Sequence, residues 1–140
     1  LSSKEQSGNG DPYVSNLGKF VNDKAVQRWR HTVSVDWEQG DVGLTLSNSY
    51  LSSYTDQNNA PDDTTGTYVQ PNRVKAYSIW DLSGAWQVMP ALTVRAGIKN
   101  LLNTSPPYSN QAWFYLSGYD PSYTDPRGRF FYASLNYKFK

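Results

Sequence analysis

The sequence predicts an all-β protein whose strands follow one another as an antiparallel meander of about five strands. Five segments alternate between apolar and polar residues with a period of two, which is typical of strands whose two faces meet different surroundings. The connections between these segments alternate between short turns and long polar loops. Large aromatic side chains also gather near both ends of the apolar positions.

The most regular of the five segments runs from Arg129 to Phe139. One face of this predicted strand carries Phe131, Ala133, Leu135, Tyr137 and Phe139, and the other carries Phe130, Tyr132, Ser134, Asn136 and Lys138. Its length is about that of a tilted strand that crosses a bilayer.

Four earlier segments repeat this pattern, at residues 28–37, 42–54, 77–88 and 92–99. Their apolar faces hold Trp29, His31, Val33, Val35 and Trp37, then Val42, Leu44, Leu46 and Tyr50, then Trp80, Leu82, Trp86 and Val88, and finally Leu92, Val94, Ala96 and Ile98. Asn48 is the polar exception on the second apolar face.

The connections predict how the strands are arranged relative to a membrane. Short turns are expected at Glu38 to Asp41, with Gly40, and at Met89 to Ala91, with Pro90, whereas long loops are expected at residues 1–25, 55–75 and 101–128. Short turns on one side and long loops on the other are typical of outer-membrane barrels, whose short turns are periplasmic. The sequence therefore predicts part of a transmembrane β-barrel.

Six of the aromatic residues are predicted to mark the two membrane interfaces: Trp29, Trp37, Trp80, Trp86, Tyr137 and Phe139. A soluble β-sandwich would also alternate, but it has no reason to place Trp and Tyr at both ends of its apolar face. The aromatic positions therefore favour the membrane interpretation.

Composition narrows the class of protein further. The 140 residues suffice for one domain. The net charge is +1 and no basic run is present, which argues against nucleic-acid binding. Cysteine is absent, so disulfides and thiolate metal sites are excluded. No run of eighteen apolar residues is present, so a transmembrane helix is excluded. Because the chain starts at Leu1 without a leader, we expect either a mature secreted β-domain or a segment that starts partway through a larger chain.

Two groups of residues resemble a known family. Gly97, Ile98, Lys99, Asn100, Leu101 and Leu102 lead to Pro106 and Pro107, and Gly118, Tyr119, Asp120 and Pro121 are followed by Pro126, Arg127, Gly128 and Arg129. In this order, and ahead of the terminal strand, they resemble the C-terminal part of a TonB-dependent receptor of the bacterial outer membrane.

The resemblance implies a barrel of about 22 strands that is plugged by an N-terminal domain. Residues 1–140 would then form the C-terminal portion of the barrel domain, with the plug domain and the earlier strands absent. It further implies four kinds of partner: outer-membrane lipid, the protein's own plug domain with the remaining barrel strands, the TonB energy-coupling protein acting through the absent N-terminal part, and an imported metal chelate such as a ferric siderophore.

Catalytic residues are not expected. His31 is the only histidine, and no Gly-x-Ser-x-Gly motif accompanies the many serines, so the sequence predicts neither an enzyme nor a cofactor. Asp56, Asn58, Asp62 and Asp63 offer hard oxygen ligands, but their spacing lacks the calcium-loop pattern. We therefore predict a solvated turn there and no metal site.

Charged residues on the polar faces, namely Arg28, Arg30, Asp36, Asp81, Arg95, Lys99 and Lys138, are predicted to point into the barrel lumen. They could serve lumen solvation and plug contact, or Arg28 and Arg30 could hold an anionic chelate near the outer mouth. Among the aromatic residues of the last long loop, Tyr108, Trp113 and Tyr115 are candidates for substrate binding, with packing onto the rim as the alternative. Tyr119, Asp120, Pro121 and residues 126–129 are expected to serve turn chemistry and rim packing.

A different class of function stays open at this point. A secreted β-sandwich that binds carbohydrate or protein through its aromatic loops would share the alternation and the long loops. Such a domain would be soluble and monomeric without detergent, whereas a barrel segment would not.

Overall fold

The computed structural model describes residues 4–6, 9–10, 12–21, 24–56, 72–109 and 118–139. Within these ranges every regular element is a strand, and none of the described residues forms a helix with the length and hydropathy needed to cross a membrane. The chain divides into two compact units. Unit 1 comprises Leu1–Arg30, Leu51–Tyr77 and Pro106–Asp125, and unit 2 comprises His31–Tyr50, Ser78–Ser105 and Pro126–Lys140.

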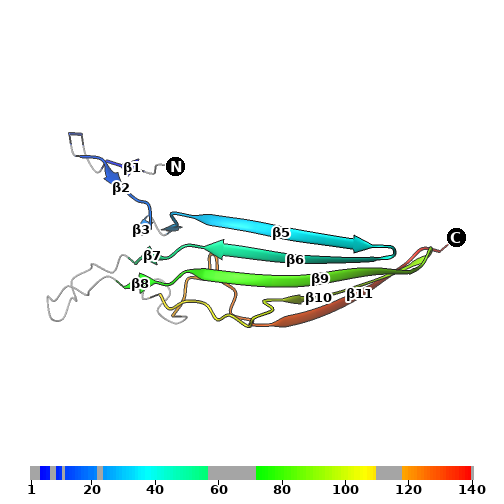
Figure 1. The fold of residues 1–140 in the computed structure, drawn as a ribbon. Helices are drawn as coiled ribbons and strands as arrows, with labels where there is room; N and C mark the ends of the chain where they lie inside the picture. The colour runs from blue at the N-terminus through cyan, green and yellow to red at the C-terminus, as the bar shows by residue number, and fades with distance from the viewer. Residues whose placement is uncertain are drawn as a thin grey trace. The chain divides into compact units, whose positions relative to one another are not determined.

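Unit 2 is built around one five-stranded sheet (Figure 1). Its strands are β5 (Arg30–Gln39), β6 (Val42–Leu51), β9 (Tyr77–Met89), β10 (Leu92–Lys99) and β11 (Phe130–Tyr137), and they lie in the order β11-β10-β9-β6-β5. Each strand therefore pairs with its neighbour along the chain, apart from the short strands of unit 1. The predicted five-stranded antiparallel meander is confirmed.

Cross-strand contacts fix the register. Strand β10 pairs antiparallel with β11 from Leu92 opposite Tyr137 to Lys99 opposite Phe130. On the neighbouring pair, the Thr32 hydroxyl bonds to that of Ser49 at 3.3 Å, and Thr45 donates to Asp36 at 2.6 Å. Residue numbers increase along β5 while those of the partners on β6 decrease, so these two strands are also antiparallel.

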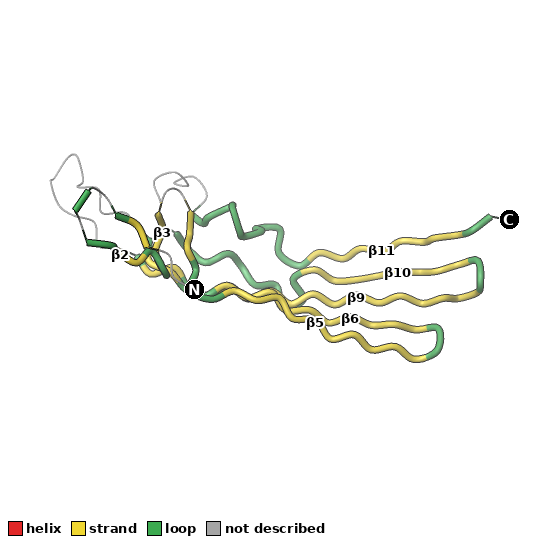
Figure 2. The backbone as a smooth tube through the Cα atoms, turned by 90° about the horizontal axis from the view of Figure 1, so that it is seen from above, coloured by secondary structure: helices red, strands yellow, loops and turns green. Residues whose placement is uncertain are grey.

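Both tight turns lie at the same end of the sheet as the C-terminus (Figure 2). Between β5 and β6 only Gly40 and Asp41 are outside the strands, and Gly40 has a φ of 58°, as the hairpin turns that match the strand twist require. Pro90 in the second turn cannot adopt a positive φ. The register between β9 and β10 shifts by one residue beside this turn, since Leu92 pairs with Met89 whereas Thr93 pairs with Gln87. Such a shift marks a β-bulge.

The two faces of the sheet differ as predicted. His31 stacks on Tyr50 with ring centroids 5.2 Å apart, and Leu44 lies over Gly84, which places each pair on the apolar face. Many large side chains of this face are exposed, among them Val33, Val35, Trp37, Leu44, Trp86, Phe131 and Leu135. Among the described residues, the buried hydrophobic side chains are Phe20, Tyr54, Val74 and Tyr77, and all four belong to unit 1. The apolar face of unit 2 is thus not covered by the described part of unit 2.

The polar exception on this face makes local hydrogen bonds. The Asn48 amide donates to Ser78 Oγ at 2.9 Å and to the Ile79 carbonyl at 3.2 Å. Asn48 therefore links β6 to β9 near the end of the sheet opposite the tight turns.

That same end is closed by asparagine turns. Asn100, with a φ of 50°, donates its amide to the Thr104 carbonyl and accepts from the Thr104 N–H, both at 2.8 Å. Asp81 accepts from the Asn100 N–H and from Lys99 Nζ, each at 2.8 Å. Asn103 accepts from the Arg129 N–H at 2.9 Å. These bonds agree with the turn chemistry predicted around Arg129.

Unit 1 contains short strands where long loops were predicted. They are β1 (Lys4–Glu5), β2 (Val14–Ser15), β3 (Lys19–Val21), β4 (Lys24–Val26), β7 (Tyr54–Thr55) and β8 (Arg73–Val74). Strands β4, β3, β7 and β8 form a sheet in that order, with β3 parallel to β7, and Phe20, Tyr54 and Val74 form its core with Ala25 and Tyr123. The prediction of plain loops at residues 1–25 and 55–75 is therefore wrong for these segments, because strands of two or three residues are too short to show periodicity.

Candidate functional site

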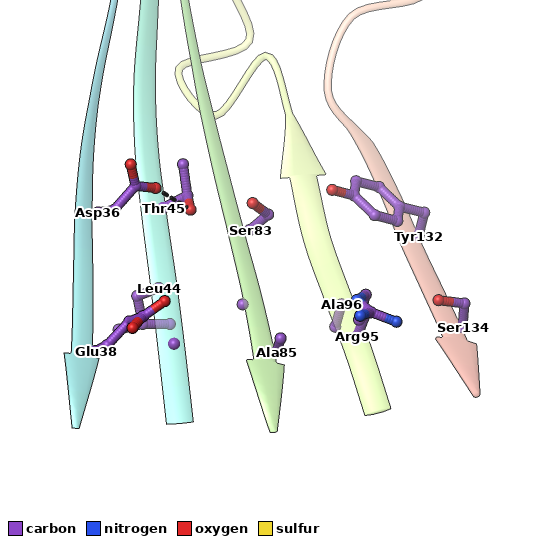
Figure 3. Close-up of a pocket in the computed structure, with 12 residues that line it drawn as sticks. Asp36, Glu38, Leu44, Thr45, Ser83, Ala85, Arg95, Ala96, Tyr132 and Ser134 are labelled. Carbon is purple, nitrogen blue, oxygen red and sulfur yellow. Dashed lines mark hydrogen bonds between the residues drawn. The ribbon is translucent and has the colours of Figure 1, made fainter. Parts of the chain in front are cut away.

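A hollow of about 320 Å³ lies on the polar face of the five-stranded sheet (Figure 3). It spans all five strands, because it is lined by Asp36, Glu38, Gly43, Leu44, Thr45, Ser83, Gly84, Ala85, Arg95, Ala96, Tyr132 and Ser134. Because side chains alternate along a strand, this face carries the even-numbered side chains of β5 and β11 and the odd-numbered side chains of β6, β9 and β10. Leu44, Gly84 and Ala96 have the opposite parity and belong to the other face.

Small side chains form the floor of the hollow. Gly43 on β6 and Ser83 and Ala85 on β9 reach little above the sheet, whereas Asp36 and Glu38 rise on β5 and Arg95 rises on β10. Glu38 was predicted to lie in the turn, but β5 continues to Gln39 and brings Glu38 onto the polar face.

Tyr132 forms the wall on β11. Its register partner is Gly97, and a Cβ atom added to Gly97 would lie 2.7 Å from Tyr132 Cε1. Since real Cβ atoms do not approach so closely, only glycine at position 97 lets the Tyr132 ring lie in its observed position across β10. Ser134, two residues along β11, shares this face.

The charges of the hollow are separated across its width. The Asp36 side chain accepts from Thr45 at 2.6 Å, whereas the side chains of Glu38 and Arg95 make no hydrogen bond or ion pair within the described part of the chain. Two strands stand between β5 and β10, so the charges stand on strands about 14 Å apart at 4.7–4.9 Å per strand. Glu38 and Arg95 are therefore too far apart to form a close ion pair in the sheet.

Three of the predicted substrate-binding residues lie in unit 1. Arg28 and Arg30 are exposed, and Arg28 packs on Gly18, where an added Cβ would lie 2.7 Å from Arg28 Nε. Tyr108 is 64% exposed, while its carbonyl accepts from the Asn72 amide at 3.4 Å and the neighbouring Ser109 is buried. Trp113 and Tyr115 lie outside the described residues.

A buried polar network holds this part of unit 1 together. Asp56 accepts from Asn72 Nδ2 at 3.0 Å and from Ser109 Oγ at 3.3 Å, and the Tyr123 hydroxyl donates to that of Tyr54 at 3.1 Å. Burial raises the pKa of both tyrosine hydroxyls above the usual range. Hydrogen bonds from Asn72 and to Asp56 thus hold the backbone at Tyr108 and Ser109, while the Tyr108 ring stays exposed.

The solvated turn predicted at Asp56 is wrong, since Asp56 is only 1% exposed. Its carboxylate accepts hydrogen bonds from an amide and a hydroxyl group of distant segments. No residue next to Asp56 in the sequence provides a basis for predicting these contacts. Asn58, Asp62 and Asp63 lie outside the described residues. Asp120 is also buried and accepts from the Ser122 N–H at 2.8 Å, which fits the predicted turn chemistry.

The predicted interface aromatics are mostly exposed. Trp29, Trp37, Trp86, Tyr137 and Phe139 are each about half exposed or more, and Trp80 is intermediate. Tyr137 and Phe139 also meet edge to face with ring centroids 4.9 Å apart. Large rings open to the surroundings next to exposed Val and Leu are unusual for a protein surface in water.

The sequence matches the family model described as "TonB dependent receptor-like, beta-barrel" over residues 3–101, well over half of the chain. The chain belongs to this family. TonB-dependent receptors are proteins of the bacterial outer membrane, and the wall of such a barrel carries apolar side chains toward lipid and polar side chains toward the interior. The secreted-sandwich interpretation loses its support.

Solved structures agree on the fold. A variant of the ferric enterobactin receptor PfeA of Pseudomonas aeruginosa, in complex with enterobactin, is 23% identical with a TM-score of 0.56, and the match covers 77% of this chain and 16% of that one. A second variant of PfeA is also 23% identical over the same shares, with a TM-score of 0.55. The chain thus spans about one sixth of the length of these receptors. No curated protein sequence matches it.

Proposed function

We propose that residues 1–140 form the C-terminal portion of a transmembrane barrel domain whose complete receptor imports a metal chelate, such as a ferric siderophore. The observation that supports this most is the one-sided sheet, with exposed apolar side chains on one face and Asp36, Arg95 and Lys99 on the other. A wall of this kind separates lipid from a polar interior, as an import channel needs. The complex of the PfeA variant with enterobactin supports the substrate class.

Ligand contact is proposed for Arg28, Arg30 and Tyr108, together with Trp113 and Tyr115. The arginines are exposed in unit 1 and carry guanidinium groups suited to an anionic chelate. The exposed Tyr108 ring adds rigid contact area at little cost in conformational entropy. The six interface aromatics, including Trp80 and Phe139, would anchor the wall in outer-membrane lipid.

The remaining proposed partners are the other parts of the receptor and the TonB protein. The plug domain and the other barrel strands would complete the pore, and TonB would act through the N-terminal part of the protein. The receptor would move its ligand without chemical change, so neither a catalytic residue nor a resident cofactor is proposed.

The test is iron uptake by a bacterial strain that lacks its own ferric siderophore receptors and expresses the full-length receptor. Growth on one of a panel of ferric siderophores, abolished when TonB is deleted, would support the proposal. A receptor in which both Arg28 and Arg30 are changed to alanine should bind that chelate at least tenfold more weakly. Arg73→Ala is the matched control, because Arg73 is an exposed cation of the same unit that bonds to Ser53 at 3.0 Å. Failure of every chelate to support TonB-dependent growth would contradict the proposed substrate class.

A further inference from the structure

We propose that Asp56 is a positioning residue for ligand binding, which holds the Tyr108 ring in place through Asn72 and Ser109 and thereby raises the affinity for the metal chelate. Asp56 is only 1% exposed, so its effect on a ligand has to pass through another residue. The inference rests on the proposed function, because Tyr108 contacts a ligand only if the complete receptor binds a chelate.

A closed circuit of hydrogen bonds joins Asp56 to the backbone at Tyr108. The side-chain amide of Asn72 donates to Asp56 Oδ2 at 3.0 Å and to the Tyr108 carbonyl at 3.4 Å. The Ser109 hydroxyl donates to Asp56 Oδ1 at 3.3 Å, and the peptide bond between Tyr108 and Ser109 completes the circuit. The two carboxylate oxygens thus hold two successive residues, one directly and one through Asn72.

The small sheet of unit 1 places the two polar side chains that start this circuit. Asp56 directly follows β7 and Asn72 directly precedes β8, and these two strands pair antiparallel. Just beyond the paired residues, the Asp56 N–H donates to the Asn72 carbonyl at 2.9 Å. Both side chains therefore extend from neighbouring points of a backbone that is itself hydrogen-bonded.

A further contact holds the Tyr108 ring from another segment of the chain. The Ser109 N–H donates to the Gly118 carbonyl at 3.0 Å. A Cβ atom added to Gly118 would lie 3.7 Å from Cδ2 and Cε2 of Tyr108, so the ring runs alongside this glycine. Because the ring is still 64% exposed, most of its surface is open to a ligand.

These contacts matter because Tyr108 lies outside regular structure. Residues 103–109 belong to neither a strand nor a helix, so no ladder of backbone hydrogen bonds fixes them. A side chain that is already held in its binding position loses less conformational freedom when the ligand arrives, which raises affinity. Breaking the circuit at Asp56 should therefore weaken binding even though the ring itself is unchanged.

The charge of Asp56 leads to the opposite expectation. A carboxylate repels an anionic chelate, so a purely electrostatic role would make binding tighter when the charge is removed. A positioning role makes binding weaker when the hydrogen bonds are removed, whether or not the charge remains. The direction of the change in affinity therefore separates the two roles.

Affinity measurements on the full-length receptor in outer-membrane vesicles test this inference, with ferric enterobactin and the other ferric siderophores of the panel as probes. Asp56→Leu and Tyr108→Ala should each weaken binding at least fivefold, and the double variant should be within twofold of Tyr108→Ala alone. Asp56→Asn should stay within twofold of the parent, because an amide can accept from Asn72 and donate to the Ser109 hydroxyl. Tyr123→Phe, which removes the 3.1 Å bond to Tyr54 in the same unit, is the matched control and should also stay within twofold.

A second measurement follows the ring without any ligand. With 4-trifluoromethylphenylalanine at position 108, we expect one narrow ¹⁹F resonance in the parent and in Asp56→Asn, and a broadened or split resonance in Asp56→Leu. Ser109→Ala removes one bond of the circuit and leaves Asp56 in place, so it should shift both readouts in the same direction even if Asp56→Leu fails to fold.

An unchanged resonance in both Asp56→Leu and Ser109→Ala would overturn the inference. Tighter binding by Asp56→Leu, or losses that multiply in the double variant, would overturn it as well. A broadened resonance in a receptor that binds no chelate of the panel would refute the proposed substrate class and leave the positioning of Tyr108 intact. Chelate uptake with an unchanged resonance would do the reverse.

Discussion

Leu44→Arg tests the assignment of the apolar face to lipid. Leu44 is 44% exposed and lies over Gly84 on that face of β6. It is four residues from Asn48, which links β6 to β9 near the opposite end of the sheet from the tight turns. Because Thr45 bonds to Asp36, the register places Leu44 opposite Trp37, one of the aromatic residues predicted to mark a membrane interface. Leu44 thus lies nearer the tight turns than the midpoint of β6, which falls between Leu46 and Ser47.

An arginine at position 44 should lower the free energy of unfolding by about 1 to 2 kcal/mol, because its charge loses hydration close to the inner boundary of the apolar band. Leu46→Arg, two residues nearer the middle of the strand, should cost about 2 to 4 kcal/mol, since the penalty increases toward the midplane. Ser47→Arg is the matched control on the polar face, where we expect a change below about 0.5 kcal/mol. Leu44→Ala separates the loss of packing on Gly84 from the effect of the charge.

Urea unfolding of the full-length receptor in lipid vesicles, followed by tryptophan fluorescence, measures these differences. The expected order of stability is Ser47→Arg above Leu44→Arg above Leu46→Arg. A Ser47→Arg variant as unstable as Leu44→Arg would refute the face assignment. Equal losses at Leu44 and Leu46 would refute the depth assignment alone.

Three further outcomes are expected in the same unfolding assay. Gly97→Ala should cost about 1 to 3 kcal/mol because its methyl group meets the Tyr132 ring, and a double-mutant cycle with Tyr132→Ala should recover at least 1 kcal/mol. Asn100→Ala should cost about 2 to 3 kcal/mol through lost hydrogen bonds and its positive φ, whereas Asn100→Gly should cost less because glycine tolerates that φ. Because burial raises the pKa of Tyr54 and Tyr123 above the unfolded value of about 10, their contribution is present below pH 10 and is lost at higher pH. Absorbance of phenolate at 295 nm should therefore show fewer tyrosines titrating near pH 10 in the folded receptor than in the unfolded one, and changing Tyr54 and Tyr123 to phenylalanine should reduce this difference by two.

The five long strands could be predicted because their signal is local. Val33 and Val35 on one face and Thr32 and Ser34 on the other report two surroundings within a few residues, so the alternation survives without knowledge of distant contacts. The order of the strands followed from the tight turns at Gly40 and Pro90.

The architecture of unit 1 could not be predicted in this way. Tyr54 bonds to Tyr123, 69 positions away, and Ser109 bonds to Asp56 across 53 positions. Such contacts leave no periodic trace, and the polarity of Asp56 suggested solvent although its surroundings are buried. Only part of the lining of the hollow could be predicted. The alternation put Asp36 and Arg95 on one face, but Glu38 was predicted to lie in a turn.

The absence of buried hydrophobic side chains among the described residues of unit 2 has a consequence for how this chain diverges from its relatives. A core such as that of Phe20, Tyr54 and Val74 is close-packed, so a new side chain there must match the old one in volume and shape. Lipid chains are fluid and rearrange around any apolar side chain, so Val33, Val35 and Leu135 need only remain apolar. Substitutions along the outer wall should therefore change the shape of the side chains freely, while their hydropathy should stay the same. Homologues that have lost recognisable identity in these strands would still keep the two-residue alternation that places them in the membrane.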